Sequence, residues 1–572
     1  MAEHLKELIR YVCRNMKKIV KVWMLAVLLG GTAADLCAQT VWHDPAAERP
    51  QSAQRMQAAT DGSQTATERY IRFITNAPSV EIRYQMAGAG GVRPCRAAAG
   101  AGGMDLYTTD CNGQQQRCEG VCQSGDTLRW ISRELTYHNT HQEGNEFTLF
   151  LPPGNNVRWM QIGVPEGSRF SFLRPSAERP VVICSPSATL GACASRPGMA
   201  WTNILQRRLD MPVICMDDSG NGQAGEKCFA QMAETDAAVF VIDCKPGRNG
   251  KETEEFRKWL EKGIRTIRTR SKAPILLVTH DCMGCRNSRT GAKDLRQAGR
   301  EVQAVCEAMR KETENLLCLT VRKPEASTNR ISATDRSMEQ CADICYQKIA
   351  ELLFPELGSL SFTPCRQHRD SYTYRWTDRH EEILEYNAKV KPEIVMLGNS
   401  ITHFWGGLPF EKRRVADDIW QELFKGRRTV NLGYGWDRIE NIQWRILHGE
   451  LDGYHAQKIF MMLGTNNLNI NTDEEIVRGI RETVSLIAGK QPQAQLYVVR
   501  ILPRRDREDR LRSLNDRLER ALADLPRVQV IDLSEALTGK DGKIREELFS
   551  DGLHPNHEGY RIIAGHLKPF LE

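Results

Sequence analysis

Four short segments in the last third of this 572-residue sequence contain the groups that ester hydrolysis needs. They are Gly-Asn-Ser at 398–400, Gly-Tyr-Gly at 433–435, Gly-Thr-Asn at 464–466 and Asp-Gly-Leu-His at 551–554. In that order they offer a nucleophile, a backbone hydrogen-bond donor, a side-chain amide donor and an acid–base pair. Each segment alone is typical of a turn. The four together, in this order, favour acyl transfer to water.

The serine and the histidine are the candidate nucleophile and base. Ser400 follows an apolar run that predicts a strand, so its hydroxyl is expected at the carboxyl end of a sheet, where α/β active sites lie. A serine hydroxyl needs an adjacent base, and His554 is the candidate. Asp551, three residues earlier, is placed to accept the other ring N–H and fix the tautomer. These three residues therefore form a candidate triad.

The N-terminus predicts an export signal. Lysines at 17, 18 and 21 precede an apolar run at 22–29 and a small-residue site that predicts cleavage after Ala38. The run is shorter than the roughly 20 residues of a membrane span. An uncleaved anchor is the alternative. Residues 1–38 contribute half of the net charge of +6, and the rest is too weakly basic to suggest a nucleic-acid partner. We expect a periplasmic or extracellular protein with no membrane span when mature.

The cysteines are unevenly distributed. Sixteen of the 18 lie between Cys95 and Cys365, and 366–572 has none. In an exported protein they are expected to form up to eight disulfides, with a pairing that the sequence does not reveal. A zinc site at the Cys118/Cys122 or Cys282/Cys285 spacing is the disfavoured alternative, because no further ligands stand at finger-like spacing. No metal and no cofactor are expected.

Hydrophobic patterning divides the rest of the chain into five segments. Residues 39–65 are polar and predict a linker, and 66–178 alternate apolar and polar residues as an antiparallel β-sandwich does. Residues 179–355 and 391–572 each alternate short apolar runs with helical patterns, which predicts two α/β domains with parallel sheets. Residues 356–390 are expected to be a linker that ends in a helix.

Residues 393–572 resemble the SGNH (GDSL-type) hydrolase family, whose Ser, Gly, Asn and His blocks match the four segments. The stretch 431–451 is similar to the catalytic subunits of platelet-activating-factor acetylhydrolase, and bacterial carbohydrate acetylesterases share the pattern. The resemblance implies a flavodoxin-like three-layer α/β/α fold and a Ser400–His554–Asp551 triad that needs no metal.

Two positions depart from the family pattern. The family's Gly-Asp-Ser is Gly-Asn-Ser here, with Asn399 in place of the carboxylate. The family's Gly-Gly-Asp is Gly435-Trp436-Asp437, so the backbone donor of the oxyanion hole is Gly435 or Trp436, alongside the amide of Asn466. The side chain of Trp436 is expected to narrow the site. We therefore expect a small acyl group, acetyl in the first place.

The middle domain resembles a less common branch of the same superfamily, and the sandwich with its Gly-Met-Asp-Leu-Tyr at 103–107 resembles the module that accompanies that branch. Ser187 and Gly220 mark its first two blocks. Gly247 stands where an Asn is expected, and no His follows Asp335 before the last helix. We expect this domain to be catalytically inactive and kept for structure or glycan binding. His280 is an alternative base.

The sequence therefore predicts an exported serine esterase that acts on small acyl esters of carbohydrates. The enzyme alternative is a lipid or phospholipid acylhydrolase. The alternative of another class is a glycan-binding surface protein with two inactive hydrolase folds. The sequence does not indicate the oligomeric state.

Overall fold

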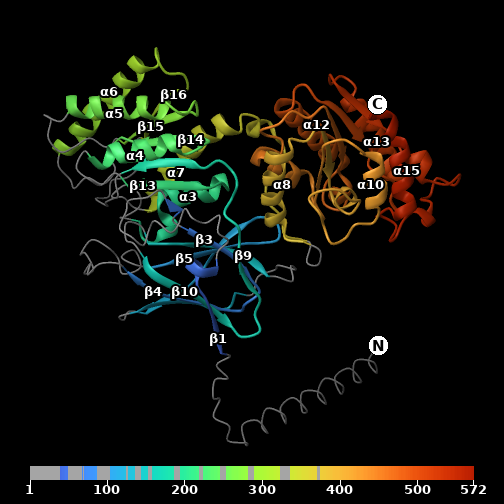
Figure 1. Ribbon diagram of the computed structural model, residues 1–572, viewed down its shortest axis with the longest axis horizontal. Coiled ribbons are helices and arrows are strands. Elements are labelled where there is room, and N and C mark those ends of the chain that lie inside the picture. The colour runs from blue at the N-terminus through green and yellow to red at the C-terminus, as the bar shows by residue number, and fades with distance from the viewer. Residues whose placement is uncertain are drawn as a thin grey trace, which may run out of the picture.

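The structure is a computed structural model with three folded parts (Figure 1). It describes residues 39–48, 67–68, 70–86, 103–123, 127–135, 144–152, 157–185, 194–217, 223–244, 253–280, 289–321, 335–369 and 374–572. An antiparallel β-sandwich is followed by a middle α/β domain and a C-terminal α/β domain. This confirms the predicted fold class, two α/β domains in tandem behind an antiparallel sandwich.

The sandwich is made of two five-stranded antiparallel sheets. The first has the order β1 (Thr40–His43), β10 (Val157–Pro165), β4 (Val80–Met86), β8 (Leu128–Ser132) and β7 (Val121–Gln123); the second has β11 (Phe170–Phe172), β3 (Tyr70–Thr75), β9 (Asn145–Phe150), β5 (Asp105–Thr109) and β6 (Gln115–Cys118). Strand β1 lies within the predicted linker 39–65. Four residues are too few to show an alternating pattern, and the partner strand β10 is distant in the sequence.

The middle domain has a six-stranded sheet in the order β16 (Leu316–Val321), β15 (Ile275–His280), β14 (Val239–Asp243), β12 (Val181–Ser185), β13 (Val213–Asp217) and β2 (Thr67–Glu68). The first five strands are parallel and β2 is antiparallel at the edge. The described helices are α3 (Trp201–Leu209), α4 (Gln223–Glu234), α5 (Thr253–Arg268), α6 (Arg289–Met309) and α7 (Asp335–Leu353). Helices α3 and α7 cover one face, and α4, α5 and α6 cover the other.

The C-terminal domain has five parallel strands in the order β18 (Thr429–Gly433), β17 (Ile394–Gly398), β19 (Lys458–Met462), β20 (Gln495–Val499) and β21 (Val528–Ile531). Helices α8 (Trp376–Val390), α11 (Ile439–Arg445), α12 (Asp473–Lys490) and α13 (Glu508–Leu522) cover one face. Helices α9 (Ser400–His403), α10 (Asp417–Leu423) and α15 (His557–Leu567) pack on the other.

Strand β17 shows why this sheet is buried on both faces. All five of its residues are buried. Val395 and Leu397 pack on the α12 side, and Ile394 and Met396 on the α15 side, because successive side chains of a strand point to opposite faces. The strand ends at Gly398, where the site begins.

Residues 356–390, predicted as a linker with a helix, join the three parts through buried side chains. The predicted helix is α8, but Arg366, which precedes it, is 5% exposed. Its guanidinium donates to Asp210 of the middle domain (2.7 Å) and to Glu146 of the sandwich (2.8 Å). Thr377 of α8 also donates to Glu146. A buried carboxylate needs such partners, so this stretch is an interface rather than a simple spacer.

The Gly-Met-Asp-Leu-Tyr motif of the sandwich docks onto the middle domain. The buried carboxylate of Asp105 accepts a hydrogen bond from the backbone N–H of Gly198 (3.0 Å) and lies 3.0 Å from the guanidinium of Arg196. A side chain at 198 would lie 2.4 Å from that carboxylate. The motif and Gly198 therefore fix how the two parts pack.

Candidate active site

Ser400 stands at the junction between β17 and α9. The side chain of Asn399 caps this short helix, since its Oδ1 accepts from the backbone N–H of Ile401 (3.0 Å). A Cβ at Gly398 would lie 2.2 Å from Oγ1 of Thr402 and 2.6 Å from the carbonyl oxygen of Met462, so only glycine fits there. The Asn that replaces the family's Asp thus keeps the capping role.

The structure brings Ser400, His554 and Asp551 together in the order of the predicted triad. His554 Nε2 lies 2.9 Å from Ser400 Oγ, across 154 residues of sequence, and His554 Nδ1 lies 2.7 Å from Asp551 Oδ2. The other carboxylate oxygen of Asp551 accepts from the backbone N–H groups of Leu553 (3.0 Å) and His554 (2.8 Å). With Nδ1–H directed at Asp551, Nε2 is free to accept the serine proton.

Burial and charge adjust the acidity of this pair. Burial lowers the pKa of His554 and outweighs the opposing carboxylate of Asp551, while the cations Arg413 and Arg504 lower it further. For Asp551, burial alone would raise the pKa. The hydrogen bonds and charge of His554 and the N–H of Leu553 outweigh it and keep this pKa below its usual value. The imidazole is therefore neutral and the carboxylate ionised near pH 7.

The second block of the family pattern is the Gly-Tyr-Gly segment at 433–435. Most of its backbone N–H groups already donate hydrogen bonds within the protein. Gly433 N–H donates to Oδ1 of Asn431 (2.8 Å), and Tyr434 N–H donates to the carbonyl of Gly398 (3.2 Å). A Cβ at Gly433 would lie 2.2 Å from the backbone nitrogen of His403. Glycine at 433 therefore lets this turn approach α9 closely, next to the serine.

The expected donor Gly435 is also engaged. Its N–H donates to Nδ1 of His403 (3.0 Å). Burial, with the nearby cations Arg379 and Arg445, keeps the pKa of His403 well below its usual range, so the ring is neutral and Nδ1 can accept. Among the described residues, the N–H of Trp436 has no acceptor, and Trp436 has a positive φ of 65°. Of the two predicted backbone donors, Trp436 is the one left available.

Asn466 lies in the 3-10 turn η7 (Thr465–Asn467) after β19. Its Nδ2 donates one hydrogen to the carbonyl of Asp437 (2.8 Å). An amide nitrogen carries two hydrogens, so this bond orients Asn466 and leaves one N–H for an oxyanion. The backbone N–H of Ser400, at the first position of α9, also lacks an intrahelical acceptor. Sequence reasoning missed this third donor, although the strand–turn–helix position of the serine signals it.

A buried carboxylate holds the second block in place. Asp437, 0% exposed, accepts from Arg445 Nε (2.8 Å), Trp376 Nε1 (2.8 Å) and Gln367 Nε2 (3.0 Å). Burial raises its pKa to about 6 against the opposing charge of Arg445. The carbonyl of Gly435 accepts from Gln367 (2.8 Å) and from the hydroxyl of Tyr374 (2.7 Å). Residues from the predicted linker thus support the turn.

The predicted degenerate site of the middle domain is only partly described. Ser187 and Gly220 lie outside the described residues, as does Gly247. At the carboxyl ends of β12, β14 and β15, Ser185 Oγ donates to Asp243 (2.6 Å), and His280 Nε2 lies 2.8 Å from the same carboxylate. His280 therefore pairs with a buried carboxylate, that of Asp243.

Among the described cysteines, one disulfide is seen, between Cys184 and Cys228, where up to eight were expected for the chain. Within the described ranges, no group of three or more His, Cys, Asp or Glu side chains could hold a metal ion. Nor does any described helix have the length and apolar character that crossing a membrane requires.

Comparison with known proteins identifies the family. Residues 178–351 and 396–562 each match the GDSL-like lipase/acylhydrolase family, and residues 49–170 match the N-terminal module of SGNH hydrolase-type esterases. The chain belongs to the GDSL-like lipase/acylhydrolase family, a family of ester hydrolases.

Individual relatives match part of the chain. Platelet-activating factor acetylhydrolase IB subunit alpha1 of Pongo abelii is 30% identical over 201 residues, which is 34% of this chain and 83% of that protein. Subunit alpha2 of Rattus norvegicus is 31% identical over 202 residues, 35% of this chain and 82% of that protein. A crystal structure described as a GDSL-like lipase from Bacteroides ovatus is 19% identical, covers 55% of this chain and 98% of its own, and has a TM-score of 0.45.

Proposed function

We propose that this protein is an exported serine esterase that removes small acyl groups, acetyl in the first place, from carbohydrates. The observation that carries the proposal is the continuous contact from Ser400 through His554 to Asp551, at 2.9 and 2.7 Å. Serine, base and orienting acid in this geometry support nucleophilic acyl transfer.

In the proposed mechanism, Ser400 Oγ attacks the ester carbonyl while His554 Nε2 takes its proton. The tetrahedral oxyanion accepts hydrogen bonds from Trp436 N–H and Asn466 Nδ2. His554 then returns the proton to the departing alcohol, which leaves an acyl-serine. A water molecule, deprotonated by His554, attacks the acyl-serine and releases the acid and free Ser400.

The acyl preference is proposed from two observations. The side chain of Trp436, at a proposed oxyanion donor, is 54% exposed and would limit the space beside the reacting carbonyl. The matched relatives carry the name acetylhydrolase. The carbohydrate part rests on the predicted export signal and the sandwich companion, which is an analogy at the level of fold and not of the site.

We also propose a role for each predicted segment of the chain. Residues 1–38 are a cleaved signal, 66–178 the sandwich module, to which β1 adds a strand and from which β2 joins the middle sheet, 179–355 an inactive hydrolase domain and 391–572 the catalytic domain. The proposed inactivity of the middle domain is supported by its sequence, since Gly247 stands where the family has an Asn and no His follows Asp335 before the last helix. A platelet-activating-factor-like lipid is the second candidate substrate, favoured by the name of the relatives and by the exposed side chain of Phe410.

The test is hydrolysis of p-nitrophenyl acetate, butyrate and octanoate by the mature protein and by the Ser400→Ala and Ser187→Ala variants. The proposal predicts that acetate is hydrolysed fastest and that only Ser400→Ala removes the activity. Faster turnover of octanoate would favour the lipid substrate. Loss of activity in Ser187→Ala would place catalysis in the middle domain and overturn the proposal.

A further inference from the structure

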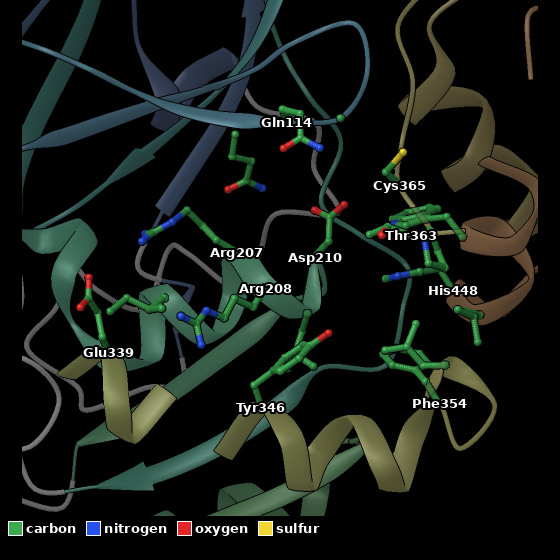
Figure 2. A pocket seen from close by; sticks show the side chains of 18 of the residues that line it. Gln114, Arg207, Arg208, Asp210, Glu339, Tyr346, Phe354, Thr363, Cys365 and His448 are labelled. Atoms are coloured by element: carbon green, nitrogen blue, oxygen red, sulfur yellow. The ribbon is translucent and has the colours of Figure 1, made fainter. Parts of the chain in front are cut away.

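A cavity of about 410 Å³ lies where the three folded parts meet, and none of its lining residues belongs to the proposed catalytic machinery. Its walls come from the β5–β6 turn, helices α3 and α7, the stretch before α8, and the C-terminal domain at Trp444 and His448. The volume is within the roughly 300–1,000 Å³ of small-molecule sites, which favour interfaces between domains. Figure 2 shows Tyr346 rising from α7 toward Asp210, and Phe354, the residue after α7, beside His448.

Two charged side chains that line this cavity are already paired. Arg208 forms an ion pair with Asp343, and Asp210 accepts from Arg366 at 2.7 Å. An anionic ligand would have to compete with Asp343 for Arg208 and would lie near Asp210. A cationic ligand would likewise have to compete with Arg366 for the carboxylate of Asp210.

The remaining arginine of the wall is also engaged. Arg207 donates to the carbonyl of Gly198 (2.8 Å), and its guanidinium stands 4.2 Å from the ring centre of Tyr107. Burial lowers the pKa of Arg207. Its guanidinium is thus held against the wall by these contacts, and the three engaged side chains, Arg207, Arg208 and Asp210, do not select a ligand of either sign.

The unpaired polar groups of the wall are mostly neutral. Gln115 Oε1 is buried without a hydrogen-bond partner among the described residues. A buried acceptor of this kind costs free energy unless a ligand or solvent satisfies it. The side chains of Tyr346, Thr363 and Glu339 also line the cavity and make no hydrogen bond or ion pair with the described residues. Hydroxyl, amide and carboxylate groups beside apolar walls suit a ligand with many hydroxyl groups.

We propose that this cavity binds a neutral oligosaccharide. Its hydroxyls donate to Gln115 Oε1 and Glu339 and exchange hydrogen bonds with Tyr346 and Thr363, while the sugar carbons pack on the apolar wall at Ile204. The site is distinct from Ser400, so binding there does not depend on ester hydrolysis and would survive failure of the proposed function.

The test is calorimetric titration of the full-length Ser400→Ala protein with unesterified cellotetraose, xylotetraose and mannotetraose, and with sodium sulfate as the anion control. Each titration is repeated with Gln115→Leu and with the matched control Gln116→Leu, whose side chain is exposed on the same strand. Thermal unfolding of the variants without ligand separates binding from folding, because an apolar replacement of an unsatisfied buried amide should not destabilise the fold.

The proposal predicts that at least one tetrasaccharide binds, that Gln115→Leu weakens it about tenfold as expected for one lost hydrogen bond, and that Gln116→Leu does not. It predicts an unchanged or higher melting temperature for Gln115→Leu, and no effect of sulfate. Absence of binding by all three tetrasaccharides would overturn it. So would equal binding by the two variants, or competition by sulfate, which would indicate an anion site.

Discussion

The carboxylate of Glu178 lies 2.9 Å from Nδ1 of His448, although 270 residues separate them in the sequence. Glu178 ends the predicted sandwich segment and is followed by β12, whereas His448 belongs to the C-terminal domain. The side chains of the two residues are 8% and 5% exposed. The contact is thus a buried link between the N-terminal half of the chain and the C-terminal domain.

The link continues to the second block of the site. Glu178 Oε1 lies 3.9 Å from Nε2 of His380, an ion-pair distance, and His380 Nδ1 lies 2.9 Å from Glu450. Glu450 pairs with Arg445, whose Nε donates to Asp437 at 2.8 Å. One buried series of charges therefore runs from the sandwich end to the turn that carries Trp436.

Glu178→Ala should destabilise the protein. Removing one member of a buried charge network leaves the others unpaired, which costs about 3–5 kcal/mol. Glu166→Ala, an exposed position at the end of β10, is the control and should change the free energy of unfolding by less than about 0.5 kcal/mol. Urea denaturation measures both. Equal stability of the two variants would show that the link contributes nothing.

The contribution of Glu178 to stability should depend on pH. Burial alone would lower the pKa of His380, but Glu178 and Glu450 raise it to about 9. The stabilisation that protonated His380 contributes is fully present below pH 6.5, the pKa of an unfolded histidine. It is lost as the pH rises through about 9, the pKa of His380 in the folded protein. Burial would raise the pKa of Glu178, but His448 and His380 lower it to about 2. The stabilisation that ionised Glu178 contributes is therefore fully present above pH 4.5, the pKa of an unfolded glutamate, and is lost as the pH falls toward 2.

The difference in unfolding free energy between the parent protein and Glu178→Gln should therefore be largest between pH 4.5 and 6.5. It should shrink on both sides of that window. Chemical denaturation at a series of pH values measures it, and comparison with the parent cancels the other titrating groups. A difference that does not vary with pH would contradict the assignment of charge to this cluster.

Asn466→Ala should lower kcat by about 10²–10³ with little change in KM, because the amide acts on the oxyanion and not on the bound substrate. Asn469→Ala is the matched control, since Asn469 is exposed nearby and bonds only the guanidinium of Arg507. Initial rates with p-nitrophenyl acetate give both constants. A change in KM alone would assign Asn466 to substrate binding.

Trp436→Gly should widen the range of acyl chains. Glycine keeps the backbone N–H and favours the positive φ of 65° at this position, so acetate turnover should be retained. Removal of the indole should raise the rate ratio of octanoate to acetate about tenfold, the scale expected for hydrophobic discrimination in a pocket. Trp159→Gly, at an exposed site on the sandwich, should leave the ratio unchanged. The same ratio in all three proteins would exclude Trp436 as the limit on chain length.

The acid limb of the kcat/KM profile should lie below pH 6.5, because burial and the neighbouring cations lower the pKa of His554 and only its neutral form accepts a proton. Replacing Arg413 and Arg504 together by glutamine removes charges that disfavour the protonated ring, so the limb should move to higher pH. Arg414→Gln, whose guanidinium lies over Phe410, is the control. A shift to lower pH in the double variant would contradict this.

Local pattern in the sequence predicts much of the fold. The apolar runs ending at Leu397, Leu432 and Val499 are strands, since a strand buried on both faces reads as a continuous apolar segment. Helix α12 begins at a capping box formed by Thr472 and Glu475. Strand ends of a parallel sheet meet at one edge, which is why Ser400 and the residues after β18 and β19 could be placed together.

Contacts between residues that are far apart in the sequence could not be predicted, because they leave no local pattern in it. Gln367 and Tyr374 lie in a stretch that reads as a linker, yet they hold the carbonyl of Gly435. His403 occupies the N–H of Gly435, which the motif alone assigns to the oxyanion. Glu178 looks like an ordinary surface acid before a strand. Each role depends on tertiary geometry, and nothing in the spacing of neighbouring residues encodes it.

The most direct test of the central claim is covalent labelling of the mature protein with a fluorophosphonate, which reacts with an activated serine, followed by peptide mass spectrometry. We expect one label per chain, on Ser400, and loss of all label in the His554→Ala variant, because the hydroxyl 2.9 Å from Nε2 needs that base. Label on Ser187, or no label in a protein that hydrolyses p-nitrophenyl acetate, would contradict it.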